Sequence, residues 1–76
     1  MQKIVIADDD EILLEGLTNA FDWHALGITV AASVADGLHA LEAVKASHAD
    51  ILLTDIRMPH MDGLSLAREL GQLGYN

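Results

Sequence analysis

The chain of 76 residues has no cysteine, one proline and only four basic residues. Without cysteine it can form no disulfide, no thiolate nucleophile and no zinc site with cysteine ligands, so its stability must come from packing. The four basic residues face twelve Asp and Glu residues, which gives a formal net charge of −8. This charge repels polyanions and excludes direct binding of nucleic acid or an anionic membrane by this segment.

Long apolar segments are also absent. The longest apolar runs, at 28–34 and 51–53, are far shorter than the ~20 residues of a membrane helix, and the first six residues lack the apolar stretch of a signal peptide. What is present is a composition of 51% hydrophobic and 21% charged residues over 76 positions. It is typical of one small packed domain, or of part of a larger one. We expect a cytoplasmic protein.

The hydrophobic pattern alternates between strand and helix. A β-branched run that stops at a cluster of acids is typical of a strand buried on both faces of a parallel sheet, and three- and four-residue spacing of apolar residues indicates helices. The predicted elements are strands at 3–7, 28–34 and 51–54, the first two read as buried, and helices at 11–21, 38–47 and 64–73. This order predicts a doubly wound α/β fold with a parallel sheet and helices on both faces. Three strands leave an unpaired edge, so we expect the first part of a larger fold.

Acidic residues follow two of the predicted strands. Asp8, Asp9 and Asp10 follow the first strand, and Asp55 follows the third. Sites in open α/β sheets form beyond the carboxyl ends of the strands, so these carboxylates converge if the two strands are neighbours. Such a cluster is tolerable mainly with a divalent cation, and all-oxygen ligands indicate Mg²⁺ or Mn²⁺. Taken singly, each Asp could instead cap a helix or end a strand.

The same residues carry a resemblance to a known family. The order of these acids, and their spacing to a following loop that contains a proline and a glycine, resemble the receiver domain of bacterial two-component response regulators. The resemblance covers essentially all 76 residues. The matching positions are Asp8, Asp9, Asp55, Met58, Pro59 and Gly63. Residues 21–28 resemble a segment common in receivers attached to AraC-type helix-turn-helix output domains. The resemblance implies a flavodoxin-like sheet with the first and third strands adjacent, and makes residues 1–76 the N-terminal part of a single receiver domain.

The resemblance also implies roles for individual residues. Asp55 would be the phosphoacceptor for a phosphoryl group carried by a sensor histidine kinase, so the segment is not itself an enzyme. Asp55, Asp9 and the backbone carbonyl of Arg57 would hold Mg²⁺ or Mn²⁺. Asp8 would contribute mainly through a bound water. Two residues are implied to shape the loop beside the acceptor: Pro59 and Gly63.

Further implications concern partners. The full-length protein would carry a DNA-binding output domain, although this segment would not itself touch DNA. The family's Ser or Thr on a fourth strand and its Lys on a fifth strand have no counterpart in the chain; Lys3 and Lys45 are predicted to lie far from Asp55. The exposed edge of the third strand predicts a homodimer or strand exchange between chains.

Two other interpretations stay open. In a phosphatase of the haloacid dehalogenase type, Asp8 would be the nucleophile and Asp10 the general acid/base, but this leaves Asp55 and the loop after it unexplained. In the second interpretation, the segment is not phosphorylated and acts only through protein–protein contacts.

The sequence also predicts several local features: helix caps at Asp10 and at Asp62, a turn at 36–37, and packing of Trp23 against the first helix. The four histidines are expected to be ordinary surface residues.

Overall fold

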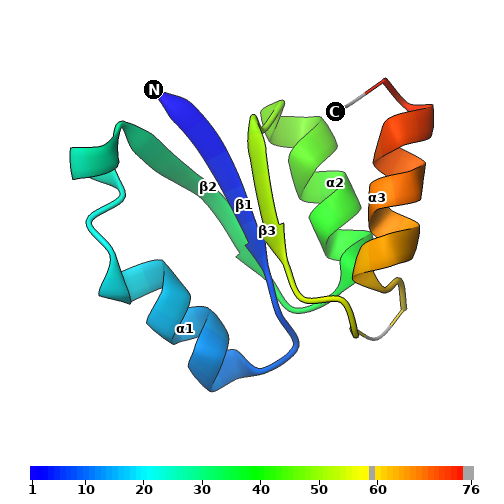
Figure 1. The fold of residues 1–76 in the computed structure, drawn as a ribbon, viewed down its shortest axis with the longest axis horizontal. Helices are drawn as coiled ribbons and strands as arrows, with labels where there is room; N and C mark the ends of the chain where they lie inside the picture. Colours follow the sequence, from blue (N-terminus) through cyan, green and yellow to red (C-terminus); the bar gives the residue numbers. More distant parts are fainter. Residues whose placement is uncertain (59, 75–76) are drawn as a thin grey trace.

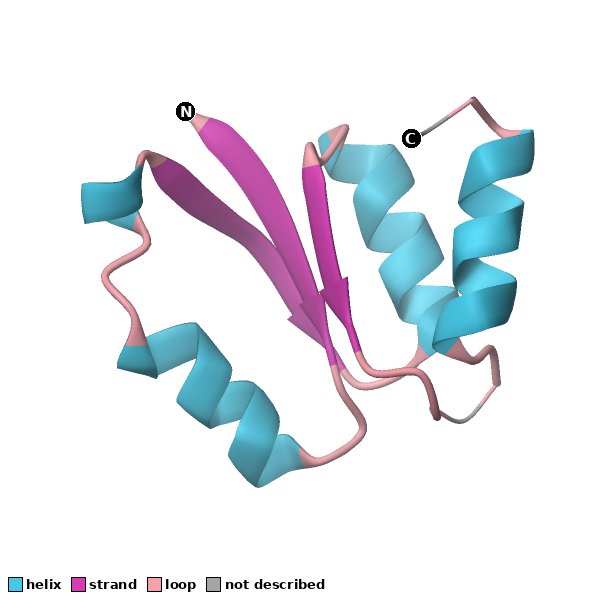
Figure 2. Cartoon of the chain, in the orientation of Figure 1, coloured by secondary structure: helices cyan, strands magenta, loops and turns pink. Residues whose placement is uncertain are grey.

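The structure is a computed structural model that describes residues 1–58 and 60–74. Three parallel strands form a sheet with α1 on one face and α2 and α3 on the other (Figures 1 and 2). The elements in chain order are β1 (Gln2–Ala7), α1 (Glu11–Ala20), the 3₁₀ turn η1 (His24–Leu26), β2 (Ile28–Val34), α2 (Gly37–Ser47), β3 (Ile51–Thr54) and α3 (Gly63–Gln72). All six predicted strands and helices are confirmed. No helix within the described ranges is long and apolar enough to cross a membrane.

The sheet has the strand order β2-β1-β3, with every pair parallel. In its register Ala7 of β1 lies opposite Val34 of β2 and Thr54 of β3. The ladder continues past the strand ends, since the Asp8 amide donates to the Val34 carbonyl at 3.1 Å and the Asp55 amide to the Ala7 carbonyl at 3.0 Å. The adjacency of the first and third strands is thus confirmed, and their acidic ends lie side by side.

The core lies between the sheet and the α2–α3 layer. β1 is buried from Ile4 to Ala7, as expected for a central strand. Its side chains on the α2–α3 face pack with small and branched residues of both helices and with a methionine of the loop between β3 and α3. The buried members of this cluster are Val5, Ala7, Ala40, Val44, Met58, Leu66 and Leu70.

The opposite face is less buried than the sequence predicts. None of the residues of α1 is buried, and Leu13 is 50% exposed. β2 is half-buried and exposed at alternate positions rather than buried on both faces, because it is an edge strand beneath this single helix. Two apolar residues expected on helix faces, Phe21 and Leu73, instead follow the helix ends and are about half exposed.

Each of the three α-helices begins after an aspartate that caps it. Asp10 accepts hydrogen bonds from the amides of Ile12 and Leu13, and Asp62 accepts one from the amide of Ser65, which confirms both predicted caps. Asp36 caps α2, so the predicted turn at 36–37 is the start of that helix. The Trp23 indole donates to two carbonyls at the end of α1, as its predicted packing requires.

Candidate functional site

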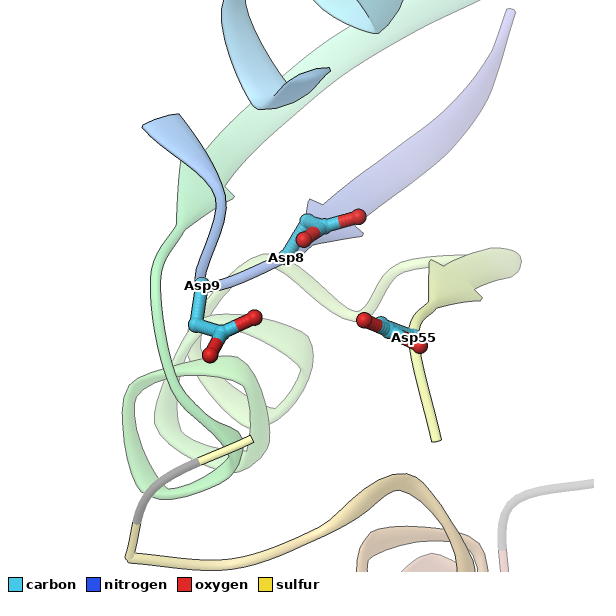
Figure 3. Close-up of side chains that lie close together, drawn as sticks. All are labelled: Asp8, Asp9 and Asp55. Carbon is cyan, nitrogen blue, oxygen red and sulfur yellow. The ribbon is translucent and has the colours of Figure 1, made fainter. Parts of the chain in front are cut away.

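Three carboxylates meet at the carboxyl edge of the sheet. Asp8 and Asp9 follow β1, and Asp55 follows β3; each offers an oxygen that lies within 4.8 Å of the other two (Figure 3). The parallel pairing of β1 with β3 brings these ends together although 47 residues separate Asp8 from Asp55 in the chain. The convergence predicted from the acidic strand ends is therefore present.

Local hydrogen bonds hold two of these carboxylates in place. Asp8 is only 5% exposed, and its Oδ1 accepts from the amide of Asp10 at 2.9 Å. Asp55 is exposed, and its Oδ1 accepts from the amide of Ile56 at 2.7 Å. Each of these bonds uses one lone pair of one oxygen, so both carboxylates keep further lone pairs on Oδ1 and Oδ2 to bind a ligand.

No basic side chain neutralises the cluster. Within residues 1–58 and 60–74 the only ion pair joins Asp36 to His39 and includes none of these three carboxylates. Three acidic groups this close repel one another, and a hard divalent cation with oxygen ligands relieves that repulsion. The donor set therefore fits Mg²⁺ or Mn²⁺. Asp10 is not in the cluster, because its carboxylate caps α1.

The loop between β3 and α3 returns closely to the end of β3. The amide of Gly63 donates to the carbonyl of Ile56 at 2.7 Å. A Cβ on Gly63 would clash with the carbonyl oxygen of Asp55 and lie 3.0 Å from the Cα of Ile56, so only glycine fits there without a shift. Arg57 is exposed at the start of this loop. Pro59, the other residue predicted to shape it, lies outside the described residues.

The lysines lie where the sequence places them. Lys3 is at the amino end of β1, where its Nζ donates to the carbonyl of Ser47 at 3.1 Å. Its main-chain amide donates to the carboxylate of Asp50 at 2.8 Å. Lys45 is in the last turn of α2. Lys3 therefore joins the amino end of β1 to the end of α2 and to the residue before β3, at the edge of the sheet opposite to the carboxylates.

Sequence reasoning missed a pair at the start of α2. The Nδ1 of His39 lies 2.6 Å from an Oδ2 of Asp36, and the His39 amide donates to Oδ1 at 2.8 Å. The His39 amide and ring together lower the pKa of Asp36, and the Asp36 carboxylate raises the pKa of His39. An Asp three residues before a His at a helix start is the signal that could have revealed it.

Comparison with known proteins now gives the family. The model of the response regulator receiver domain matches residues 4–76. The transcriptional regulatory protein YesN of Bacillus subtilis is 36% identical over 70 residues, which are 92% of this chain and 19% of YesN. The receiver domain of AraT from Geobacillus stearothermophilus superposes with a TM-score of 0.89 at 38% identity, over 93% of this chain and 55% of that one.

A second similar structure is a chain of the CheX–CheY–BeF₃–Mg²⁺ complex from Borrelia burgdorferi. It is 28% identical, with a TM-score of 0.81 over 95% of this chain and 54% of that chain. The present chain thus spans about a fifth of YesN and little more than half of the solved chains. The family match covers nearly the whole sequence and agrees with the strand order and the acidic edge. The chain belongs to the response regulator receiver domain family, whose members are signalling modules and not enzymes.

Proposed function

We propose that Asp55 accepts a phosphoryl group from a phosphohistidine of a partner sensor kinase. The observation that carries the proposal is the meeting of Asp8, Asp9 and Asp55 within 4.8 Å at the ends of two neighbouring strands. In the transfer, an Asp55 oxygen forms a bond to phosphorus while the bond from phosphorus to the histidine nitrogen breaks. The histidine leaves as a neutral imidazole once its nitrogen takes up a proton.

The contacts of Asp55 favour one of its oxygens as the nucleophile. Oδ1 already accepts the Ile56 amide, and none of the described residues donates to Oδ2. An attack by Oδ2 leaves the Ile56 hydrogen bond intact, so the carboxylate keeps its orientation during the reaction. The exposure of Asp55 lets a partner's phosphohistidine reach it.

The proposed cofactor is Mg²⁺, with Mn²⁺ as a substitute. Asp8, Asp9, Asp55 and the backbone carbonyl of Arg57 would hold it. When bound, the ion neutralises charge on the phosphoryl oxygens as an anionic carboxylate approaches an anionic group. The BeF₃ and Mg²⁺ named for the similar CheX–CheY complex support this part of the proposal.

The test is the intact mass of the protein before and after incubation with Mg²⁺ and acetyl phosphate. We expect wild type to gain one phosphoryl group, and Asp55→Asn and an EDTA-treated sample to gain none. If wild type gains nothing while it binds Mg²⁺, the chain is not a phosphoacceptor. That result would favour the interpretation in which it acts only through protein–protein contacts.

The phosphatase interpretation has lost its support. It requires Asp10 as a general acid/base, whereas the Asp10 carboxylate accepts amides of α1 at 3.0 and 3.2 Å. The family match also covers Asp55 and the loop after it, which that interpretation leaves unexplained.

The proposal extends to the whole protein and to self-association. The resemblance of residues 21–28 and the similarity to YesN support a cytoplasmic transcription regulator with an AraC-type DNA-binding output domain. Within the described residues β3 pairs only with β1, and its Leu53 is 40% exposed. This edge could pair with a second copy or exchange strands with it. Analytical ultracentrifugation of this chain should then show a dimer, and a compact monomer at every concentration would overturn this part.

A further inference from the structure

We infer that Gly37, in the first turn of α2, is a positioning residue for the loop between β3 and α3. The inference rests on the proposed function, because that loop carries the Arg57 carbonyl proposed to bind Mg²⁺. Gly37 itself is 18 residues before Asp55 in the chain and belongs to a different element. It would act only through its contact with the loop.

The contact is a close approach of two backbones. A Cβ built on Gly37 would collide with the carbonyl oxygen of Met61 and would lie 2.6 Å from its carbonyl carbon and 2.7 Å from its Cβ. Real Cβ atoms essentially never come this close to another atom, so any other residue at 37 forces one side to move. Gly37 is also buried.

The helix side of this contact is the fixed side. Asp36 caps α2 at the residue before Gly37, and its carbonyl accepts the amide of Ala40 at 3.0 Å. Ala40 is fully buried and Val44 is 3% exposed, so α2 is packed against the sheet on the same side. Moving the first turn of α2 would disturb the main core.

The loop side can yield. Among the described loop residues, 57, 58, 60 and 61 form no main-chain hydrogen bond with the rest of the protein. His60 has a φ of 70°, a left-handed conformation that a residue other than glycine keeps only where surrounding contacts hold it. The ends of the loop are fixed by the bond from Gly63 to Ile56, and Met58 packs into the core. On the far side of the loop, the Met61 side chain packs against the same core, and the approach of the Met61 carbonyl to Gly37 adds a contact between the two backbones.

We expect a displacement of Met61 to be transmitted along the loop past the packed Met58 side chain to the main chain of Arg57, because the described residues 57, 58, 60 and 61 form no main-chain hydrogen bond that would hold them. Gly37→Ala should move this part of the loop while the carboxylates of Asp8 and Asp9, which come from β1, stay where they are. The expected result is weaker Mg²⁺ binding: the Mg²⁺ concentration for half-maximal phosphorylation rises about tenfold, as for other substitutions behind a metal site. The phosphorylation rate at saturating Mg²⁺ should change much less than the half-maximal Mg²⁺ concentration. A general loss of structure would instead lower the rate at saturating Mg²⁺ as well.

Two other helical glycines give matched controls. A Cβ on Gly16 of α1 or on Gly71 of α3 would have no atom within 4 Å. Gly16→Ala and Gly71→Ala should therefore leave the half-maximal Mg²⁺ concentration unchanged. Thermal unfolding of all three variants by circular dichroism establishes which of them are folded at the assay temperature.

A measurement on wild type keeps the inference testable if Gly37→Ala does not fold. The six glycine amides can be followed by ¹⁵N NMR during a titration with Mg²⁺ alone. We expect the Gly37 and Gly63 resonances to shift with one common dissociation constant, and the Gly16 and Gly71 resonances to stay in place. Shifts at Gly63 without any at Gly37 would overturn the inference.

The outcomes separate the inference from the proposed function. If wild type is phosphorylated and Gly37→Ala, folded, needs the same Mg²⁺ concentration, the positioning role is wrong and Asp55 remains the acceptor. If wild type neither binds Mg²⁺ nor gains a phosphoryl group, the proposed function itself fails, and the inference fails with it.

Discussion

The two faces of the sheet are built very differently. On the α2–α3 face, Ala40, Val44 and Leu66 are buried against β1. On the α1 face, the helix buries none of its residues, and Ile12 is 86% exposed. The carboxylate cluster lies at the edge between the two, with Asp8 and Asp9 leading into α1 and Asp55 leading into the loop before α3. The comparison shows that stability comes mostly from one face, while the site draws residues from both.

The largest expected difference is in core truncation. Leu66→Ala removes a fully buried side chain and should lower the free energy of unfolding by about 2–5 kcal/mol. Leu13→Ala, at a residue 50% exposed on the α1 face, should lower it by less than about 1 kcal/mol. Urea unfolding followed by circular dichroism measures both. Leu64→Ala, on α3 but 65% exposed, is the matched control and should be nearly neutral. Equal losses for Leu66 and Leu13 would refute the difference between the faces.

The second largest difference between the two faces is expected when a helix cap is removed. Asp10→Ala and Asp36→Ala each remove a carboxylate that accepts amides of the first turn, which is typically worth about 1 kcal/mol. Because α1 is little buried, loss of Asp10 should expose mainly the amides of α1 to hydrogen exchange. Loss of Asp36 should speed exchange throughout α2 and β1. A uniform increase across the molecule after Asp10→Ala would mean that α1 is as firmly packed as α2.

Replacing two glycines in helices should change stability less than these losses, and in the opposite direction. Gly16→Ala and Gly71→Ala should each raise the free energy of unfolding by up to about 1 kcal/mol, because alanine is a better helix former and no atom obstructs its Cβ. The gain at Gly16 should also slow hydrogen exchange in α1. Thermal unfolding measures the first effect and amide exchange the second. A loss of stability at either position would mean that the space around that helix is filled in solution.

The smallest expected effect is a pH dependence on the α2 side. The raised pKa of His39 means that its ion pair with Asp36 stabilises the fold below the ordinary histidine value of 6.5, and that this contribution is lost as pH rises through the raised pKa. The lowered pKa of Asp36 means that its contribution is present above 3.8 and lost as pH falls through the lowered value. Nearby, Glu42 raises the pKa of His39 and His60 lowers that of Asp36.

The corresponding measurement compares wild type with His39→Gln by urea unfolding from pH 5 to pH 8. Wild type should be the more stable protein near pH 5, and its advantage should shrink as the pH rises. The effect should be small, because the His39 ring is 69% exposed and water screens the pair. An advantage that grows toward pH 8 would contradict the assignment of the pair.

Much of this architecture is local in the sequence and could be predicted from it. The change from β-branched runs to three- and four-residue spacing defines each element to within about a residue or two. The acids after β1 and β3 identified the candidate site, but periodicity alone does not say which strands are neighbours. That adjacency came from the resemblance to a family, and the pairing of Ala7 with Thr54 confirms it.

The features that the sequence did not reveal depend on tertiary distances. The approach of Met61 to Gly37 joins a loop to the first turn of α2, 24 residues apart, and nothing local to either segment predicts it. The exposure of α1 and β2 depends on what covers that face of the sheet. The amphipathic pattern of the helix and the continuous apolar run of the strand therefore overestimated their burial. The pair of Asp36 and His39 was visible in the sequence only as a cap position followed by a histidine.

The central claim is that the carboxylate cluster makes Asp55 the phosphoacceptor, and locating the phosphoryl group tests it most directly. The protein is incubated with Mg²⁺ and acetyl phosphate, the acyl phosphate is reduced with borohydride to fix its position, and the modified residue is identified by peptide mass spectrometry. We predict modification at Asp55 alone, and none when Mg²⁺ is removed with EDTA. Modification at Asp8, or modification of Asp55 that does not depend on a divalent cation, would contradict the account.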